Sequence, residues 1–402
     1  MFLSALVIFL ACNESDGEIA EILPVEGENR FSPITSFVLA TPDAVLGSDG
    51  RYHLVYELQI TNVTGLTWII NSIDILDVNS DNILETISGE EVEEKVQAIS
   101  TRTPTNTVEP DQSVLVFLTF SVEAPEDIPA NITHRLKITI PGGIPDGFAN
   151  FAGIPPGSPE YTEFTGQTGV NPPDAILLGP PLKGDNWVAA DGCCTAVRHI
   201  RGYNAVNGKI FIAQRFAIDW EKLDDQNRIF VGDPLDVNNY FCYGEEAIAV
   251  SDATVVTVVN EFEDQVPGQL PPGITLEEAD GNHVILDLGG GRFALYAHLI
   301  RDSILVEEGQ QVTKGEVLGL VGNSGNTLAP HLHFHVMDGP SSLGSNGLPY
   351  MHDNYVLLER GASTEAFDEA EGTGIPLETI PVDNPGPQTD NLMLDLSIVN
   401  FE

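Results

Sequence analysis

Basic residues are scarce in this sequence: 17 Lys and Arg stand against 60 Asp and Glu in 402 residues, a formal net charge of -43 at pH 7. A surface with this balance repels the phosphates of nucleic acid and the anionic face of a membrane. The composition therefore argues against a nucleic-acid-binding function. The acidic residues are spread along the chain and 42% of the residues are hydrophobic, which indicates folded protein with an acidic, hydrated surface.

Cysteine is also scarce, with four residues and no CxxC spacing of the kind that indicates a structural zinc site. In an oxidising compartment, Cys242 could form a disulfide with either Cys193 or Cys194, leaving one thiol unpaired. Buried structural cysteines are favoured over a thiol nucleophile near His199. The sequence leaves the disulfide state open.

The apolar N-terminal run MFLSALVIFLA is too short to span a bilayer, which takes about 20 residues, and is typical of an export signal. FLAC resembles a bacterial lipoprotein cleavage box with Cys12 as the acylated residue, although the first basic residue is Arg30. We therefore expect residues 1–24 to be a signal or lipoprotein segment and Cys12 to be a possible membrane tether. A periplasmic or outer-membrane lipoprotein is favoured over a secreted protein.

The chain length predicts two domains. Residues 25–145 contain alternating apolar runs such as YHLVYELQITN at 52–62 and SVLVFLTFSV at 113–122. Several strands of this kind predict an immunoglobulin-like β-sandwich. Residues 146–185 are rich in Pro and Gly, as in IPPGSP and NPPD, and are predicted to be a linker.

Apolar alternation resumes within residues 186–345, which predicts a second, β-rich domain and a mostly β fold overall. Residues 346–402 form an acidic, Pro-rich extension. Its final run LMLDLSIVNF at 392–401 could add a strand, and the segment before that run is expected to be mobile.

Histidines alternate in the stretch HLHFHV, where His331, His333 and His335 occupy every second position. In a strand, such side chains project from one face. A catalytic zinc site usually has three protein ligands, with imidazole and carboxylate groups among the commonest, and keeps a fourth position for water. The stretch is therefore a candidate metal-binding edge.

Five motifs in order along residues 186–345 resemble the lysostaphin-like, or LytM-type, zinc metallopeptidases, which are peptidoglycan endopeptidases. The motifs are FAIDW at 216–220, YGEEAIAV at 243–250, YAHL at 296–299, GQQVTKGEVLGLVGNSGNT at 309–327 and PHLHFHV at 330–336.

The resemblance implies that zinc is held by His199, Asp219 and His333, and that His298 and His331 form the catalytic pair. His199 and Asp219 are separated by an insertion where the family commonly has HxxxD. His335 stands where the family often has an acidic residue, and the sequence leaves open whether it supports the site or is exposed.

The implied function is a zinc-dependent endopeptidase that hydrolyses peptidoglycan cross-links or bridges, with Gly-rich peptides as an alternative substrate. One alternative is a non-catalytic relative that binds peptidoglycan or regulates another hydrolase. Another is a lipoyl- or biotinyl-like carrier, since GQQVTKGEVLG resembles the hairpin of those domains, but Lys314 lies in a different context.

Overall fold

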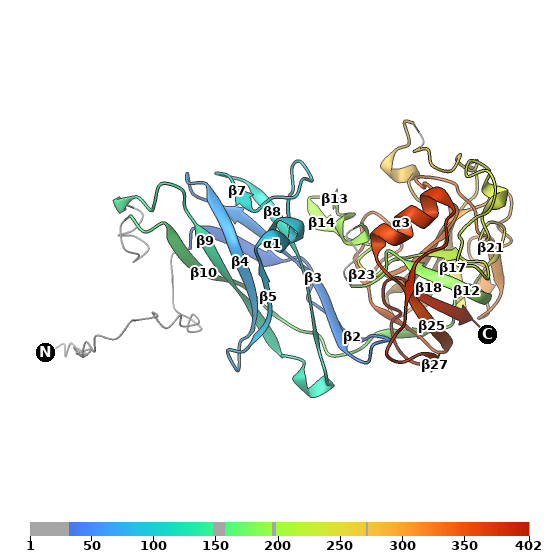
Figure 1. Ribbon diagram of the computed structural model, residues 1–402, viewed down its shortest axis with the longest axis horizontal. Helices are drawn as coiled ribbons and strands as arrows, with labels where there is room; N and C mark the ends of the chain where they lie inside the picture. The colour runs from blue at the N-terminus through green and yellow to red at the C-terminus, as the bar shows by residue number, and fades with distance from the viewer. Residues whose placement is uncertain (1–31, 148–156, 195–197, 271, 402) are drawn as a thin grey trace, which may run out of the picture.

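The computed structural model describes residues 32–147, 157–194, 198–270 and 272–401. The signal or lipoprotein segment predicted at 1–24, with Cys12, lies outside these residues. The chain is mostly β and forms two lobes that lie side by side in Figure 1. Within the described residues, no helix has both the length and the apolar character to cross a membrane.

The N-terminal lobe, here called the sandwich, consists of two antiparallel sheets. One has the strand order β1-β3-β8-β6 with β2 on β3, and the other has the order β10-β9-β4-β5 with β7 on β4. The elements are β1 (Ile34–Val38), β2 (Ala44–Leu46), β3 (Tyr52–Asn62), β4 (Trp68–Asp77), β5 (Ile83–Ser88), α1 (Glu90–Lys95), β6 (Val96–Ala98), β7 (Thr107–Val108), β8 (Ser113–Val122), β9 (Asn131–Thr139) and β10 (Glu160–Gly169).

The two sheets enclose one apolar core, which confirms the predicted two-layer β architecture of this region; its immunoglobulin-like character stays a prediction. Alternate residues of β3 and β8, such as Tyr56 and Leu118, point into this core. The residues between them, such as Val55 and Phe117, belong instead to the core of the second lobe. Because this sheet is buried on both faces, β8 is an almost continuous apolar run.

The structure corrects the linker predicted at 146–185. Residues 160–169 form β10, which pairs with β9 and extends the sandwich beyond residue 145. The overall Pro and Gly content of the stretch hid the run YTEFT, which is rich in the aromatic and β-branched residues that favour strands. The predicted domain boundaries as a whole stay a prediction.

The second lobe, here called the C-terminal lobe, has a central sheet of the order β20-β17-β18-β19-β22-β15-β12-β28-β25-β26. Its first strands and helices are β11 (Ile176–Leu178), β12 (Gly184–Ala190), the short 3-10 helix η2 (His199–Arg201), β13 (Asn204–Val206), β14 (Lys209–Phe211), β15 (Ile218–Lys222), β16 (Glu246–Ile248), β17 (Ala253–Val259), β18 (Asn282–Gly289) and β19 (Arg292–Leu299). The remaining ones are β20 (Gln311–Val312), β21 (Val317–Leu320), β22 (Leu332–Met337), β23 (Gly347–Leu348), β24 (Tyr350–His352), β25 (Tyr355–Gly361), α3 (Thr364–Thr373), β26 (Thr379–Ile380), β27 (Gly386–Gln388) and β28 (Ser397–Phe401).

The C-terminal extension is part of this sheet. Its final run forms β28 between β12 and β25, which confirms the predicted added strand. The segment before it was expected to be mobile, and this is wrong: it forms α3, whose Ser363 side chain accepts a hydrogen bond from the Ala366 N–H and caps the helix. Phe367 of α3 is buried in the core of the lobe.

The cysteines pair differently from the arrangement considered from the sequence. Cys193 is bonded to its neighbour Cys194, and Cys242 is a buried free thiol. The Cys242 Sγ donates to the Pro330 carbonyl oxygen at 2.9 Å. Cys242 therefore supports the backbone that leads into His331 instead of forming a cross-link.

A buried ion pair joins the lobes. Arg215 lies shortly before β15 in the chain. Its guanidinium donates two hydrogen bonds of 2.9 and 2.6 Å to the Glu57 carboxylate on β3. The Glu57 and Arg215 side chains are 1% and 4% exposed. Arg215 also donates to the Gly347 carbonyl oxygen at 3.0 Å.

We expect Arg215→Met to lower the free energy of unfolding by about 3–5 kcal/mol, because it leaves the Glu57 carboxylate buried without its partner. The double variant Glu57→Leu, Arg215→Met should regain most of that loss, since neither charge is then buried. Urea unfolding of the three proteins measures this. Equal losses in the single and double variants would show that packing, and not the unpaired charge, is responsible.

A second buried polar contact lies inside the sandwich. The His134 ring donates from Nδ1 to the Thr165 carbonyl oxygen at 3.2 Å, and its Nε2 accepts from the Tyr56 hydroxyl at 2.8 Å. Burial lowers the pKa of His134 to about 4, despite backbone hydrogen bonds that favour its charged form. The ring is therefore neutral in the folded chain at neutral pH.

Between pH 6.5 and 4 the unfolded chain binds a proton at His134 that the folded chain does not. Folding stability from this group is therefore complete above pH 6.5 and is lost as the pH falls, by about 3 kcal/mol at pH 4. His134→Gln should remove this part of the slope. Urea unfolding from pH 7 to 4 tests it, and parallel profiles for the two proteins would contradict the assignment.

Candidate metal centre

Three neighbouring strands bring the predicted site residues together. In the register of the sheet, His333 on β22 lies opposite Asp219 on β15 and opposite Ala297 on β19. His331 directly precedes β22, and His298 is near the end of β19. The sheet pairing alone therefore places Asp219, His333 and the end of β19 side by side.

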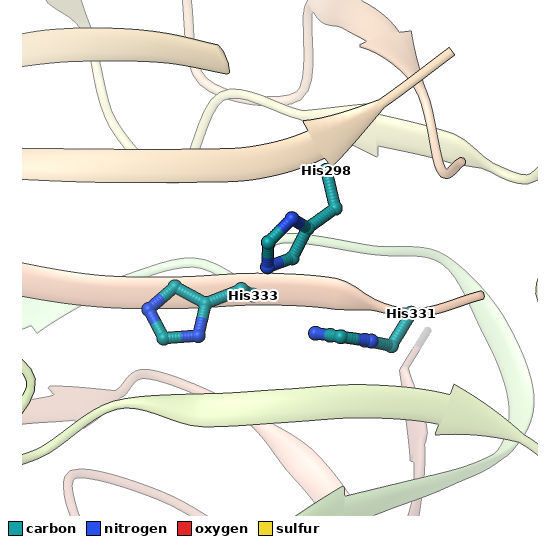
Figure 2. Close-up of side chains that lie close together, drawn as sticks. All are labelled: His298, His331 and His333. Atoms are coloured by element: carbon teal, nitrogen blue, oxygen red, sulfur yellow. The ribbon is translucent and has the colours of Figure 1, made fainter. Parts of the chain in front are cut away.

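The backbone of His298 is unusual, with a φ of 65°. Side chains alternate between faces along a regular strand, so a regular β19 would place Ala297, and not His298, on the face of His333. The left-handed conformation breaks this alternation at a cost in backbone energy. As a result, the His298 ring lies beside the rings of His331 and His333, as Figure 2 shows.

The ligand-type atoms form two overlapping groups. His199, Asp219 and His333 have such atoms within 4.8 Å of one another, and so do His298, His331 and His333. His333 belongs to both groups. All five residues singled out from the sequence are therefore in one place, and all but Asp219 are buried.

Hydrogen bonds orient three of the rings in the same way. His199, His298 and His331 each have Nδ1 at 2.8 Å from a backbone carbonyl oxygen, of Asp191, Ser324 and Ala329 respectively. An imidazole that donates from Nδ1 keeps the lone pair on Nε2. Bonds of this kind fix the ring and the tautomer of metal-binding histidines.

His333 is held the other way round. Its Nδ1 lies 2.7 Å from Asp219 Oδ1, and its Nε2 lies 2.9 Å from His335 Nδ1. If Nε2 donates to His335, the lone pair of His333 is on Nδ1, toward Asp219. His335 is completely buried, so it supports the His333 ring and is not an exposed residue.

The electrostatics of the cluster centre on Asp219. Burial opposes the charge on this carboxylate, but His199, His331 and His333 hold its pKa well below the usual range. Burial also opposes the charge on His199, yet Asp219 and Asp191 raise its pKa to about 9. The ionised Asp219 carboxylate thus favours the charged form of the His199 ring.

His298 behaves in the opposite way. Burial, followed by repulsion from His331 and His333, lowers its pKa well below the usual range. Burial also lowers the pKa of His333, despite Asp219. The neutral rings of His298 and His333 and the ionised Asp219 carboxylate are donor groups that suit zinc.

These side chains line one end of a cavity of about 560 Å³. Leu270 and Leu328 lie on its rim and are 63% and 46% exposed. The lining also includes Glu371 of α3 and the buried Glu221. The cavity is large enough for a short stretch of peptide.

Sequence reasoning missed two carboxylates that line this cavity, those of Glu221 and Glu371. Glu221 lies two residues after Asp219 on β15, so the strand period could have placed both carboxylates on one face. Burial and the nearby Glu371 raise the pKa of Glu221 well above the usual range. Glu371 is on a helix of the C-terminal extension, and no local motif pointed to it.

Comparison with known proteins gives a family match for part of the chain. Residues 239–345 match the model of peptidase family M23. The predicted resemblance is confirmed for this segment. It contains His298, His331 and His333, whereas His199 and Asp219 lie before it.

One curated relative is the peptidoglycan DD-endopeptidase ShyA of Vibrio cholerae, 40% identical over 57 residues. The match covers 14% of this chain and only 13% of that protein. The M23 protein EnpA of Enterococcus faecalis has a catalytic domain 17% identical, with a TM-score of 0.25, covering 44% of this chain and 93% of that domain. The catalytic domain of lysostaphin from Staphylococcus simulans is 18% identical, with a TM-score of 0.22, covering 40% of this chain and 84% of that domain.

Proposed function

We propose that the protein is a zinc-dependent endopeptidase that hydrolyses peptide bonds in peptidoglycan. The observation that carries the proposal is the shared position of His333 in two overlapping groups of ligand-type atoms, in a cavity wide enough for a peptide. One group has the two imidazoles and one carboxylate of a zinc site with an open position. The other offers imidazoles beside it.

In this proposal His199 Nε2, Asp219 and His333 Nδ1 hold the zinc ion. The fit is supported by the ring orientations. His199 Nε2 and His333 Nδ1 both face the Asp219 carboxylate, at 3.2 and 2.7 Å, while their second nitrogens face the Asp191 carbonyl oxygen and His335. Bound zinc supplies a water of lowered pKa and polarises a carbonyl oxygen.

His298 and His331 serve the reaction through Nε2. The Nδ1 atoms bond Ser324 and Ala329, so each ring is fixed while Nε2 stays available in the cavity. An imidazole in this position takes a proton from the attacking water, returns one to the leaving amine, or donates to the oxygen on which negative charge develops. The proposal gives both rings a role in proton transfer without dividing the steps between them.

Peptidoglycan is the proposed substrate because ShyA, the curated relative matched over 57 residues, is described as a peptidoglycan DD-endopeptidase. An exported chain, with Cys12 as a tether to the membrane, would place the cavity in the cell envelope where this polymer is found. Gly-rich peptides are the alternative substrate. The Gly-containing segment GNSGNTLAP before His331 allows the backbone of an extended peptide with small side chains to approach closely.

The experiment is digestion of purified sacculi by the full chain, with and without a zinc chelator, and mass spectrometry of the released fragments. We expect one zinc ion per chain and fragments with a newly formed amine and carboxylate at a peptide bond. Chelation should stop their release, and added zinc should restore it. Sacculi that stay intact while zinc is bound would favour the non-catalytic relative, and a chain without zinc would contradict the metal site.

A further inference from the structure

The segment between His199 and Asp219 contacts the sandwich. It begins with η2, continues through the hairpin β13–β14 and returns to β15. Figure 1 shows this hairpin between the two lobes. The insertion that separates the two proposed ligands in the sequence is therefore one of the parts of the C-terminal lobe that lie against the sandwich.

Tyr203, four residues after His199, is held by the loop after β6. Its hydroxyl donates to the Ile99 carbonyl oxygen at 2.9 Å. Arg102 Nη2 donates to the Tyr203 carbonyl oxygen at 2.6 Å, and the guanidinium carbon lies 4.4 Å from the centre of the Tyr203 ring. Tyr203 is only 3% exposed, so the sandwich holds both its backbone and its side chain.

Arg201, two residues after His199, reaches the sandwich as well. Its guanidinium donates to the Glu94 carbonyl oxygen at the end of α1 and lies over the Phe117 ring of β8. The same residue closes the turn that carries the proposed ligand: the Arg201 N–H donates to Arg198 and the Gly202 N–H donates to the His199 carbonyl oxygen. A shift of Arg201 therefore moves the backbone of His199.

The other end of the insertion is fixed by the Arg215–Glu57 pair, four residues before Asp219. From there the chain passes Ala217, whose carbonyl oxygen lies 3.3 Å from His199 Nδ1. Contacts with the sandwich thus flank both proposed ligands.

We infer that the sandwich is a positioning element of the metal site, acting through the insertion on His199. This inference depends on the proposed function, because it assumes that His199 is a zinc ligand. Without the sandwich contacts, His199 keeps the bond to Asp191 but loses the anchors that order the residues after it. An ordered ligand binds more tightly because less conformational entropy is lost on binding.

Arg102 and Tyr203 are the positioning residues to test. Neither lines the cavity, and replacing them removes none of the proposed ligand side chains. The variants are Arg102→Ala, Tyr203→Phe and their combination, each made in the full chain and again in a His199→Ala background. Arg292→Ala is the control, because it removes a partly exposed arginine that pairs with Asp174 at the far end of β19. Zinc affinity is measured by competition with chelators of graded strength, and folding by circular dichroism.

In the chain with His199, the double variant should weaken zinc binding about 10-fold, as loss of an outer support of a ligand does. In the His199→Ala background the same pair should change it less than about twofold, because independent effects add and this one has no ligand left to act through. Arg292→Ala should change neither affinity. If the double variant does not fold, Tyr203→Phe is scored by the same comparison.

The loss of zinc affinity caused by the double variant is compared between the chain with His199 and the His199→Ala background. If the two losses differ by less than threefold, the inference is overturned, because the sandwich would then support the fold and not His199. If His199→Ala itself leaves the affinity unchanged, the inference also fails, but the proposed peptidase stands on its remaining residues. A wild-type chain that binds no zinc contradicts the proposed function and the inference together.

Discussion

The His333→Ala variant is expected to lose zinc binding and hydrolysis together. His333 is the one residue shared by the two groups of ligand-type atoms, and its Nδ1 lies 2.7 Å from Asp219. Removing the ring deletes a proposed ligand and also the hydrogen bond between His333 Nε2 and His335 Nδ1. The loss of affinity should exceed the 10- to 100-fold typical of a missing outer support, and activity should fall to the background.

Metal content after dialysis and fragment release from sacculi measure the two losses. His283→Ala is the matched control, since His283 is on β18 of the same sheet and its Nδ1 lies 2.9 Å from the Gly281 carbonyl oxygen. It should retain zinc and activity. A His333→Ala protein that keeps one zinc ion or normal turnover would overturn the assignment of the centre.

The central part of this site could be predicted because its residues are close in the sequence or follow one periodic rule. His331 and His333 alternate in HLHFHV, and both rings reach the same cluster, although every residue of β22 is buried. His298 sits in the YAHL motif, but periodicity alone would have turned it away from His333. Its left-handed backbone brings it into the cluster, and no local signal in the residues themselves indicates that conformation.

Other parts could not be derived from local patterns, because they depend on contacts between distant segments, and the pairing of His199 with Asp219 was implied only by the family resemblance. His199 and Asp219 meet because β12 and β15 are paired and the chain between them docks on the sandwich. Helix α3, which lines part of the cavity, was predicted from its composition to be a polar extension, because a helix with one buried stripe has little apolar content. The alternating apolar pattern of β8 indicates a strand with one buried face, but its second face is covered by the other lobe.

The second large effect is expected from His298→Ala, which should keep its zinc and lose turnover. His298 belongs to the group of three histidines but not to the group with Asp219. Its Nδ1 is occupied by the Ser324 carbonyl oxygen, so only Nε2 is available to the cavity. Loss of a positioned acid–base group typically slows the chemical step about 10²- to 10⁴-fold.

The measurement is turnover at saturating substrate together with metal content and affinity. Zinc affinity should stay within about threefold of wild type, whereas kcat falls by the factor given above with little change in KM, as expected for an interaction made mainly in the transition state. The same assay on His298→Ala, His331→Ala should show less than the product of the two single losses, because groups that act as a unit are not additive.

Two results would contradict this division of roles. Unchanged turnover in His298→Ala would remove the ring from the reaction, and loss of zinc would make it a ligand in place of His199. The second result is distinguishable because His199→Ala would then retain its metal. Since His333 neighbours both His199 and His298 in edge-to-face contacts, metal retention in the two single variants decides which of these neighbours completes the zinc site.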